Sequence, residues 1–505
     1  MEARSVVIIG AGVAGLSVGC YAQMNGYRSV IYEMHNIPGG LCTSWKRGDY
    51  VFDGCIDWFT GSAPDNMFYP HWQELGVIGR HRFLYHDEYC RYTDGEDTVV
   101  FWLDTKRLKD ELLRVSPQDA VPINELCQLL DTFRGFAPPV AKPQELMNIW
   151  DYIEMMPGMI SHGKQYSAFF KYGKISMAEF ATRFQSGLLR GMLETIWNKQ
   201  MPVSLFAATM AWCAARTAGY PEGGSLGPAR SIEARYMELG GTVVYKTRVT
   251  GINVENGKAV GITLADGSKV AADIVISAAD CHATVKEMLG GQYVSEKLSD
   301  WFSHSPTFPA NIQVSLGVAM DLGHLPRLAC HKLKRPLLIA GKEEPFLTLH
   351  NYSFDSTLAP AGKTTLAVRF FTDCAYWQAL SADRAAYKAE KDALAQAVIG
   401  VLDELIPGIA DSVEVVDVAT PQTYIRYTGT WKGATMSWLP TTANFSYSLD
   451  KTLPGLRNFY LCGQWLCPGG GIPNALKTAR DAIQVICRAD RKTFMTSTPD
   501  VSSST

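Results

Sequence analysis

The sequence predicts an α/β fold, because two glycine-rich turns at opposite ends of the chain each join a short apolar strand to a helix. The first turn follows the apolar run 6–9, and the second follows the run 459–461. A third group of strand patterns lies between residues 221 and 279. We therefore expect a sheet assembled from three distant segments, with the remaining chain folded between them.

The opening unit has the spacing of a dinucleotide-binding turn. Gly10 permits a tight turn, Gly12 lets the backbone approach a pyrophosphate, and Gly15 lets the next helix pack closely on the strand. The helix N-terminus would face the phosphate charge. A second strand, 30–32, ends at Glu33, eighteen positions after Gly15, which suits an acid that binds a ribose. This order of elements predicts a bound dinucleotide.

A second glycine pair indicates which dinucleotide binds. Gly39 and Gly40 follow Glu33 closely and precede Leu41 and a strand pattern at 50–53. A nicotinamide site needs no such pair, whereas a flavin site uses one so that the chain can run beside the ribose and pyrophosphate. The order of elements favours FAD over NAD.

The C-terminal unit would complete the cofactor site. The strand 459–461 leads to Gly463 and Gln464, and three consecutive glycines, 469–471, precede a helix that we expect to begin near Ala475 with Asn474 as its cap. Backbone N–H groups at a positive helix end suit the ribityl pyrophosphate or the flavin ring.

These segments resemble those of the flavoproteins that include carotenoid desaturases, carotenoid isomerases and retinol saturases, and more distantly the flavin amine oxidases. The stretches 221–279 and 420–433 match as well. The resemblance implies a Rossmann-like FAD-binding domain of the GR2 type with an interleaved α+β substrate domain, and it implies that Val249 contacts the adenine through its backbone. The predicted cofactor-binding residues are Gly10, Gly12, Val13, Ala14, Gly15, Glu33, Gly39, Gly40, Leu41, Val249, Gly463, Gln464, Gly470, Gly471, Ile472 and Ala475.

The sequence departs from the flavin oxidases at two of these positions. Many of those enzymes carry arginine after the glycine pair, where this chain has Leu41, and an acidic residue after the glycine that matches Gly463, where it has Gln464. The lysine that amine oxidases commonly place near the flavin has no assignable counterpart.

The resemblance predicts a discontinuous domain organisation. Residues 1–60, 215–285 and 455–490 would form the FAD-binding domain, and residues 61–214, mainly helical, and 286–454 would form the substrate-binding domain. The tail 491–505 contains many serines and threonines near its end and is predicted to be disordered.

Composition excludes some functions and leaves a membrane question open. The formal net charge of −3 gives no reason to expect nucleic acid. Twelve cysteines lie without a Cys-x-x-Cys pair or metal-ligand spacing, so we predict reduced thiols, no metal and a cytoplasmic location. No apolar run is long enough to span a bilayer. Residues 146–160 are rich in Met, Trp and Tyr, which suits a surface that contacts a membrane or the entrance of an apolar tunnel. The alternative is an amphipathic helix packed on the core of the protein itself.

Three functions from different classes fit this sequence. The first is an FAD-dependent enzyme that desaturates, saturates or isomerises a long apolar isoprenoid or carotenoid, with O2, a quinone or an external donor as electron partner. The second is a flavin oxidase of amines or another smaller polar substrate. The third is a non-catalytic prenyl-binding relative, such as the Rab GDP-dissociation inhibitors. No catalytic dyad is evident, and the pocket candidates are Asp57, Trp58, Tyr427, Trp431 and Trp465.

Overall fold

The computed structural model describes residues 3–136, 140 and 142–499. Its central element is a parallel five-stranded sheet, as the opening and closing units predict. All three predicted segments supply strands to it, in the order β10 (Thr242–Val244), β2 (Arg28–Tyr32), β1 (Ser5–Ile9), β14 (Ile274–Ser277) and β20 (Phe459–Leu461).

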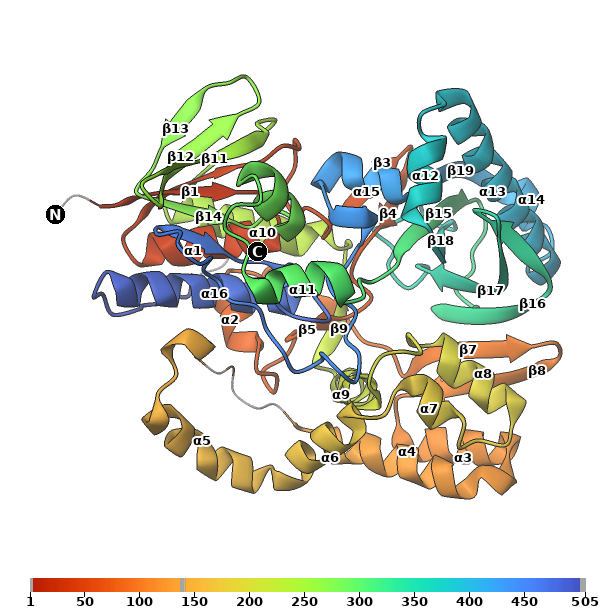
Figure 1. Ribbon diagram of the computed structural model, residues 1–505. Helices are drawn as coiled ribbons and strands as arrows, with labels where there is room; N and C mark the ends of the chain where they lie inside the picture. The colour runs from red at the N-terminus through yellow and green to blue at the C-terminus, as the bar shows by residue number, and fades with distance from the viewer. Residues whose placement is uncertain (1–2, 137–139, 141, 500–505) are drawn as a thin grey trace.

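Helices from both ends of the chain pack together against this sheet. α1 (Val13–Met24) and α16 (Gly471–Ala489) lie side by side (Figure 1), and α10 (Leu226–Glu238) packs on α1. Their shared core includes Ile8, Leu16, Leu476 and Ile483, all fully buried. Burying each such side chain contributes about 1.5–3 kcal/mol, so this packing holds the two glycine turns at one edge of the sheet. A small antiparallel sheet adjoins it, made of β11 (Val249–Glu255), β12 (Lys258–Leu264) and β13 (Lys269–Ala271).

A hairpin leads the chain away from the parallel sheet. β3 (Ser44–Arg47) and β4 (Tyr50–Asp53) follow the second glycine pair and bring Asp57 toward a separate sheet. A short sheet of β5 (Phe59–Thr60), β9 (Ala218–Pro221) and β6 (Phe83–Leu84) lies beyond it, next to α2 (Tyr69–Glu74).

The second large sheet has seven strands and one helix-covered face. Its order is β19 (Val413–Ala419), β15 (Ala310–Val318), β18 (Thr364–Thr372), β17 (Lys342–Asn351), β16 (Leu328–Ile339), β7 (Glu88–Asp94) and β8 (Asp97–Trp102). Neighbouring strands of this sheet pair antiparallel, except that β7 pairs parallel with β16. Apolar side chains of α13 (Arg384–Leu405) share a core with the sheet. Further helices on this side are α12 (Cys374–Leu380), α14 (Ile409–Ser412) and α15 (Pro421–Thr428).

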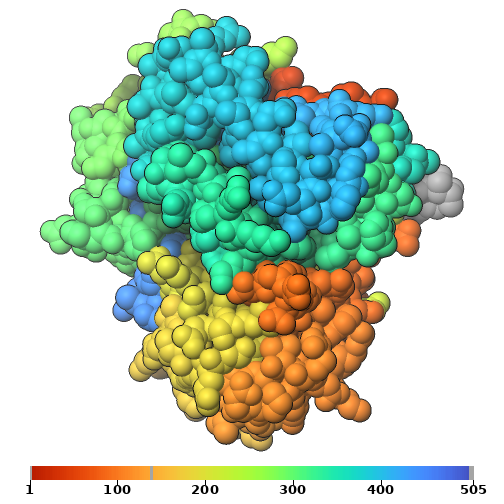
Figure 2. Space-filling view, turned by 90° about the vertical axis from the view of Figure 1, so that its right-hand side faces the viewer, coloured from red at the N-terminus to blue at the C-terminus, as the bar shows by residue number. Residues whose placement is uncertain are grey.

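A helical layer lies below this sheet (Figure 2, orange and yellow below teal). It comprises α3 (Thr105–Val115), α4 (Ala120–Phe133), α5 (Ile149–Ser161), α6 (Gly163–Gly173), α7 (Met177–Ala181), α8 (Gly187–Thr195) and α9 (Val203–Ala214). The segment 61–214 is thus mainly helical, as predicted. It also supplies β7 and β8, which the helical prediction missed, to a sheet otherwise built from residues 310–419.

The C-terminal tail differs from its predicted disorder over residues 491–499. The backbone N–H of Met495 donates to Asn25 Oδ1 at 2.8 Å, and the Arg235 guanidinium donates to the carbonyl of Ser497 at 3.2 Å. The Phe494 ring lies 4.9 Å from the Arg480 guanidinium. These contacts hold the segment against α1 and α10, which the Ser/Thr-rich composition does not reveal. Residues 500–505 lie outside the described residues.

Candidate functional site

A large cavity of about 2060 Å³ lies at the carboxyl ends of the parallel strands. Gly10 follows β1, Glu33 follows β2, Ala278 follows β14 and Gly463 follows β20, and all four residues line it. Ligands of open parallel sheets bind in the crevice outside the carboxyl ends of the strands. Pockets for a single small molecule typically measure about 300–1,000 Å³, so this cavity has room for a cofactor and a second, long ligand.

The first glycine turn places an uncapped helix end at the cavity. Gly10 adopts a φ of +94°, and its N–H donates to the carbonyl of Tyr32 at 2.8 Å. A Cβ at Gly15 would lie 1.8 Å from the carbonyl oxygen of Gly10, so only glycine allows this helix-to-strand contact. Gly12 caps α1 without a side-chain hydrogen bond, which leaves N–H groups of the first turn for a ligand. The arrangement suits a pyrophosphate.

The acid at the end of β2 is fixed at the cavity wall. Glu33 is buried, and its two carboxylate oxygens accept hydrogen bonds from the N–H groups of Ala11 and His35, each at 2.7 Å. A carboxylate offers about four acceptor positions, so Glu33 can also accept hydrogen bonds from ribose hydroxyls.

The second glycine pair runs directly beside the first turn. Gly12 and Gly39 form a parallel bridge, and the Gly39 N–H donates to the carbonyl of Ala11 at 2.8 Å. Gly39 has a φ of +105°, and a Cβ there would lie 2.3 Å from the carbonyl oxygen of Cys42. The pair therefore brings two stretches of bare backbone to the cavity wall, as a flavin site requires.

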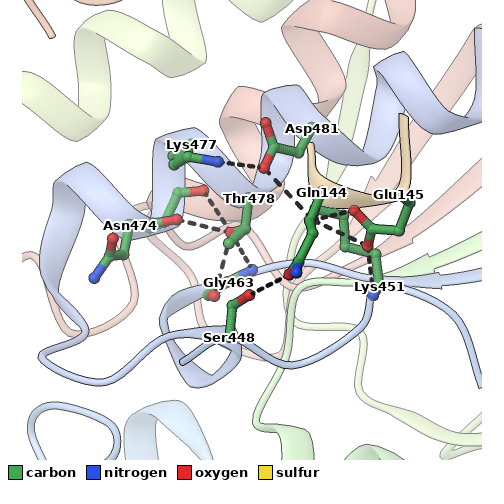
Figure 3. Close-up of polar contacts among 10 residues, drawn as sticks. Gln144, Glu145, Ser448, Lys451, Gly463, Asn474, Lys477, Thr478 and Asp481 are labelled. Atoms are coloured by element: carbon green, nitrogen blue, oxygen red, sulfur yellow. Dashed lines mark hydrogen bonds and ion pairs between the residues drawn. The ribbon is translucent and has the colours of Figure 1, made fainter. Parts of the chain in front are cut away.

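The C-terminal turn lies opposite the two glycine turns, and the three together form what we call the cofactor cradle. Gly463 has a φ of +121°, and its N–H donates to Thr478 Oγ1 at 2.9 Å, which ties the turn to α16 (Figure 3). Gln464 Oε1 accepts from the N–H of Gly471 at 3.2 Å. The expected helix start is wrong by four residues, because α16 begins at Gly471 and Asn474 donates back to the carbonyl of Gly470 instead of capping.

An ion-pair cluster anchors a distant segment beside this turn. The buried Lys451 ammonium lies 3.2 Å from both carboxylate oxygens of Glu145 and 3.5 Å from Asp481, which also pairs with Lys477 at 2.7 Å (Figure 3). Glu145 belongs to a short turn just before α5. The cluster thus fastens the start of α5 to the helix that carries the cofactor cradle.

Most predicted site residues meet in this one cavity. Among the predicted cofactor residues, the cavity is lined by Gly10, Gly12, Val13, Ala14, Glu33, Gly39, Gly40, Leu41, Val249, Gly463, Gln464, Gly470, Gly471, Ile472 and Ala475. Gly15 packs behind the turn. Which of these atoms touch the cofactor remains a prediction.

The five pocket candidates divide into three kinds. Asp57, Trp58 and Trp465 line the cavity. Tyr427 also lines it but sits at the rim, 41% exposed, with its ring 4.8 Å from His35 beside Glu33. Trp431 is not among the lining residues: its ring stacks on that of His282 at 4.6 Å, within an aromatic cluster that includes Trp465.

One face of the seven-stranded sheet forms a cavity wall that the sequence analysis missed. Glu344, Phe346, Thr348 and His350 alternate along β17 and all line the cavity. Arg369 on β18 lines it as well. Alternation over 344–350 was the available signal, but the intervening Leu347 and Leu349 are also buried, so the pattern does not reveal which face meets a ligand.

A buried ionic cluster joins this wall to the segment after β4. Arg369 Nη1 donates to the two carboxylate oxygens of Asp57 at 3.2 and 3.1 Å, and Arg327 donates to the backbone carbonyl of Asp57 at 3.1 Å. Burial alone would raise the pKa of Asp57, but Arg369, His350 and Arg327 together hold that pKa well below its ordinary value. Asp57 is therefore a carboxylate at neutral pH.

The cavity continues from the cradle into an aromatic region. The ring of Trp58 stacks on that of Trp197 at 5.7 Å and lies 6.4 Å from Tyr89. Side chains that line this region come from the helical layer and from β17: Tyr166, Phe169, Phe170, Trp197, Leu205, Trp212 and Phe346. Such a wall suits an apolar ligand.

The residues at the sheet edge fit FAD. Two glycine turns expose backbone beside an uncapped helix end, a fixed carboxylate lies at the end of β2, and a second helix begins at the glycines after β20. Bound there, FAD would supply a two-electron carrier, while the protein supplies position and a dry surrounding.

Comparison with known proteins agrees with this assignment. The family described as flavin containing amine oxidoreductase matches residues 13–487. The chloroplastic prolycopene isomerase of Arabidopsis thaliana is 24% identical over 491 residues, covering 92% of this chain and 80% of the relative. The neurosporene-forming phytoene desaturase of Rhodobacter capsulatus is 25% identical over 515 residues, covering 95% of this chain and 93% of the relative.

Solved structures show the same fold at lower identity. Cyclohexylamine oxidase from Brevibacterium oxydans matches with a TM-score of 0.57 at 13% identity, over 97% of this chain and all of that one. The chain belongs to the flavin containing amine oxidoreductase family and is an FAD-dependent oxidoreductase.

Proposed function

We propose that the protein desaturates, saturates or isomerises C–C bonds of a long apolar isoprenoid or carotenoid-like substrate. The observation that carries this proposal is the size and lining of the cavity. Its 2060 Å³ exceed a single-ligand site, and the part beyond the FAD cradle is walled by Trp58, Trp197, Trp212 and Phe346. The names of the two relatives, a carotenoid isomerase and a phytoene desaturase, agree with such a substrate.

Oxidation of an amine or another small polar substrate is the second candidate, and the family name favours it. A small amine would leave most of the aromatic region unfilled. The non-catalytic prenyl-binding alternative would not need the two glycine turns that form the FAD cradle. For these reasons the long apolar substrate is the better proposal.

We also propose that α5 contacts a membrane surface from which such a substrate enters. Figure 1 places α5 at the periphery of the molecule, and its apolar side chains are exposed: Ile149 (67%), Trp150 (69%), Tyr152 (51%), Ile153 (46%), Met156 (53%), Met159 (46%) and Ile160 (75%). The alternative of a helix packed on its own core does not fit these values. The next helix, α6, supplies Tyr166, Phe169 and Phe170 to the cavity wall, which places the apolar lining directly after the exposed helix in the chain and supports entry from this side.

The membrane contact would be peripheral, with the bulk of the protein in the cytoplasm. In the described part of the chain, no helix combines the length and apolar character that a membrane crossing requires. The electron partner of the reaction, whether O2, a quinone or an external donor, is proposed on chemical grounds alone.

Anaerobic mixing of the FAD-loaded protein with detergent-dispersed polyenes and, separately, with amines tests the main proposal. Polyenes should bleach the oxidised flavin, or be converted by the reduced protein, whereas amines should not. Ala208 lines the aromatic region on α9, away from the glycine turns, so Ala208→Trp should block polyene conversion and leave FAD content unchanged. Ala208→Ser is the matched control. Bleaching and peroxide release with amines alone would instead establish the second candidate.

A further inference from the structure

His350 lies where the seven-stranded sheet meets the cofactor-side segment after β4. It is on β17, lines the cavity and is only 8% exposed. Its Nδ1 atom lies 3.4 Å from Oδ1 of Asp57, and its ring runs nearly parallel to that of Tyr352, at an interplanar angle of 17°. The imidazole therefore lies next to a carboxylate, with the Tyr352 ring centroid 6.4 Å away, at the edge of the cavity.

The carboxylate that faces His350 is itself fixed. Arg369 uses all three of its nitrogens: Nη1 donates to both carboxylate oxygens of Asp57, Nε donates to Gln313 Oε1 at 3.0 Å, and Nη2 donates to Tyr352 Oη at 3.0 Å and the carbonyl of Asp53 at 3.4 Å. Arg369 is therefore held from several sides. Its role is to hold Asp57 in place.

This geometry selects one tautomer of the imidazole. A carboxylate facing Nδ1 favours the proton on that nitrogen, which leaves the lone pair on Nε2. Within the described part of the chain, the only hydrogen-bonding group that acts on the His350 ring is Asp57, on the Nδ1 side, which leaves Nε2 without a partner although His350 lines the cavity. Because His350 lines the cavity, this free acceptor is available to a bound ligand.

The charge state also suits proton transfer. Burial and the Arg369 guanidinium lower the pKa of His350, Asp57 opposes them by raising it, and Arg327 lowers it further. The net effect is a neutral imidazole at neutral pH, which can accept a proton. Tyr352 and the carboxyl of Asp53 are the other titratable groups near this cluster. Tyr352 Oη accepts a hydrogen bond from Arg369. The Asp53 carboxyl accepts from Tyr220 Oη and the Ser225 N–H instead, since Arg369 reaches only the backbone carbonyl of Asp53.

We propose that His350, positioned by Asp57, is the catalytic proton-transfer residue of this cavity. The inference rests on the proposed function and names the group that performs the proton step. In desaturation, one substrate carbon loses a hydride to oxidised FAD, and the neighbouring C–H bond breaks. Its electron pair forms the C=C bond, and the proton moves to Nε2 of His350. In saturation Nε2 of His350 would return the proton, and the hydride would come from FAD in its reduced form.

The main test compares His350→Gln with His331→Gln, a histidine on β16 that is not among the lining residues. With a polyene that the parent protein converts, His350→Gln should slow flavin reduction by about 10²–10⁴-fold, the usual contribution of general acid–base catalysis. FAD content and the thermal midpoint should match those of the parent. His331→Gln should react like the parent. Asp57→Asn, which keeps the side-chain shape, should slow the reaction less than His350→Gln.

A second measurement does not depend on turnover. In protein labelled with ¹⁵N-histidine, the His350 resonances should show the Nδ1–H tautomer, and Asp57→Asn should shift the population toward Nε2–H. His350→Gln and His331→Gln assign the signals by loss of a resonance.

The outcomes separate the two levels of the proposal. If the parent protein converts no polyene, the proposed function fails, and the tautomer still decides whether the dyad exists. If the parent converts a polyene and His350→Gln does so at the parental rate, the proton-transfer role is wrong while the function stands. An Nε2–H tautomer in the parent protein also overturns the inference, whether or not His350→Gln folds.

Discussion

Arg369 and Asp57 form a two-pronged ion pair across the wall of the cavity, with Arg369 Nη1 at 3.2 and 3.1 Å from the two carboxylate oxygens. The pair links β18 to the segment that leaves the FAD cradle, 312 positions away in the chain. It therefore connects the seven-stranded sheet to the segment that leaves the glycine turns, at the wall of the cavity.

Breaking this pair should destabilise the fold. Asp57→Ala leaves a guanidinium that is only 15% exposed without its carboxylate, and we expect the free energy of unfolding to fall by about 1–2 kcal/mol, less than for a fully buried pair. The exposed pair Lys388–Asp392 provides the control: with side chains 77% and 62% exposed, its loss in Asp392→Ala should cost less than about 0.5 kcal/mol. Urea titration of both variants measures the difference, and equal losses would show that the Arg369–Asp57 pair contributes no more than a surface pair.

Asp280 should make stability depend on pH in the mildly acidic range. Burial raises the pKa of this cavity-lining carboxyl to about 6, although the N–H groups of Ala283 and Trp431 donate to it. The folded protein therefore holds the proton more tightly than the unfolded chain, whose aspartate pKa is about 4. The stabilisation that protonated Asp280 gives the folded protein is fully present below about pH 4. It is lost as the pH rises to about 6, which lowers the free energy of unfolding by about 2–3 kcal/mol. Asp280→Asn should flatten the stability profile over this interval; a slope equal to that of the parent protein would contradict the assignment.

Gly15→Ala should abolish FAD binding. The added methyl group would lie 1.8 Å from the carbonyl oxygen of Gly10, a backbone atom that cannot move without distorting the turn. We expect purified Gly15→Ala to lack the visible absorbance of flavin and not to regain it on reconstitution. Gly400→Ala is the control, because nothing lies within 4 Å of that Cβ position, and an alanine inside α13 should add up to about 1 kcal/mol of stability. A yellow Gly15→Ala protein would argue against the predicted turn.

Membrane binding should depend on α5. Replacing Trp150 and Ile160 by serine removes two of its most exposed apolar side chains and should abolish co-flotation with phosphatidylcholine vesicles, while flavin content stays unchanged. Leu338→Ser removes a comparably exposed side chain (71%) from β16 and should float like the parent protein. If all three proteins float equally well, α5 is not the contact surface.

The cofactor cradle could be predicted from sequence because its requirements are local. Gly10 needs a positive φ, Gly15 and Gly39 need the absence of a Cβ, and Glu33 needs only to end the second strand. Each requirement fixes a residue type at a short, constant spacing in the sequence, so glycine spacing and strand pattern were sufficient to predict the dinucleotide site. The α/β fold and the FAD cofactor follow from the same spacings.

Only the tertiary structure decided which side chains face the cavity beyond the cofactor cradle. His350 and Leu349 are neighbours on one buried strand, and only the packing of β17 determines which of them meets the cavity. The charge and orientation of the Asp57 carboxylate depend on Arg369 and His350. These two residues reach Asp57 only because the seven-stranded sheet packs against the segment that carries it. Contacts between residues far apart in the chain leave no periodic signal in the sequence, since they arise only when the separately determined elements pack together.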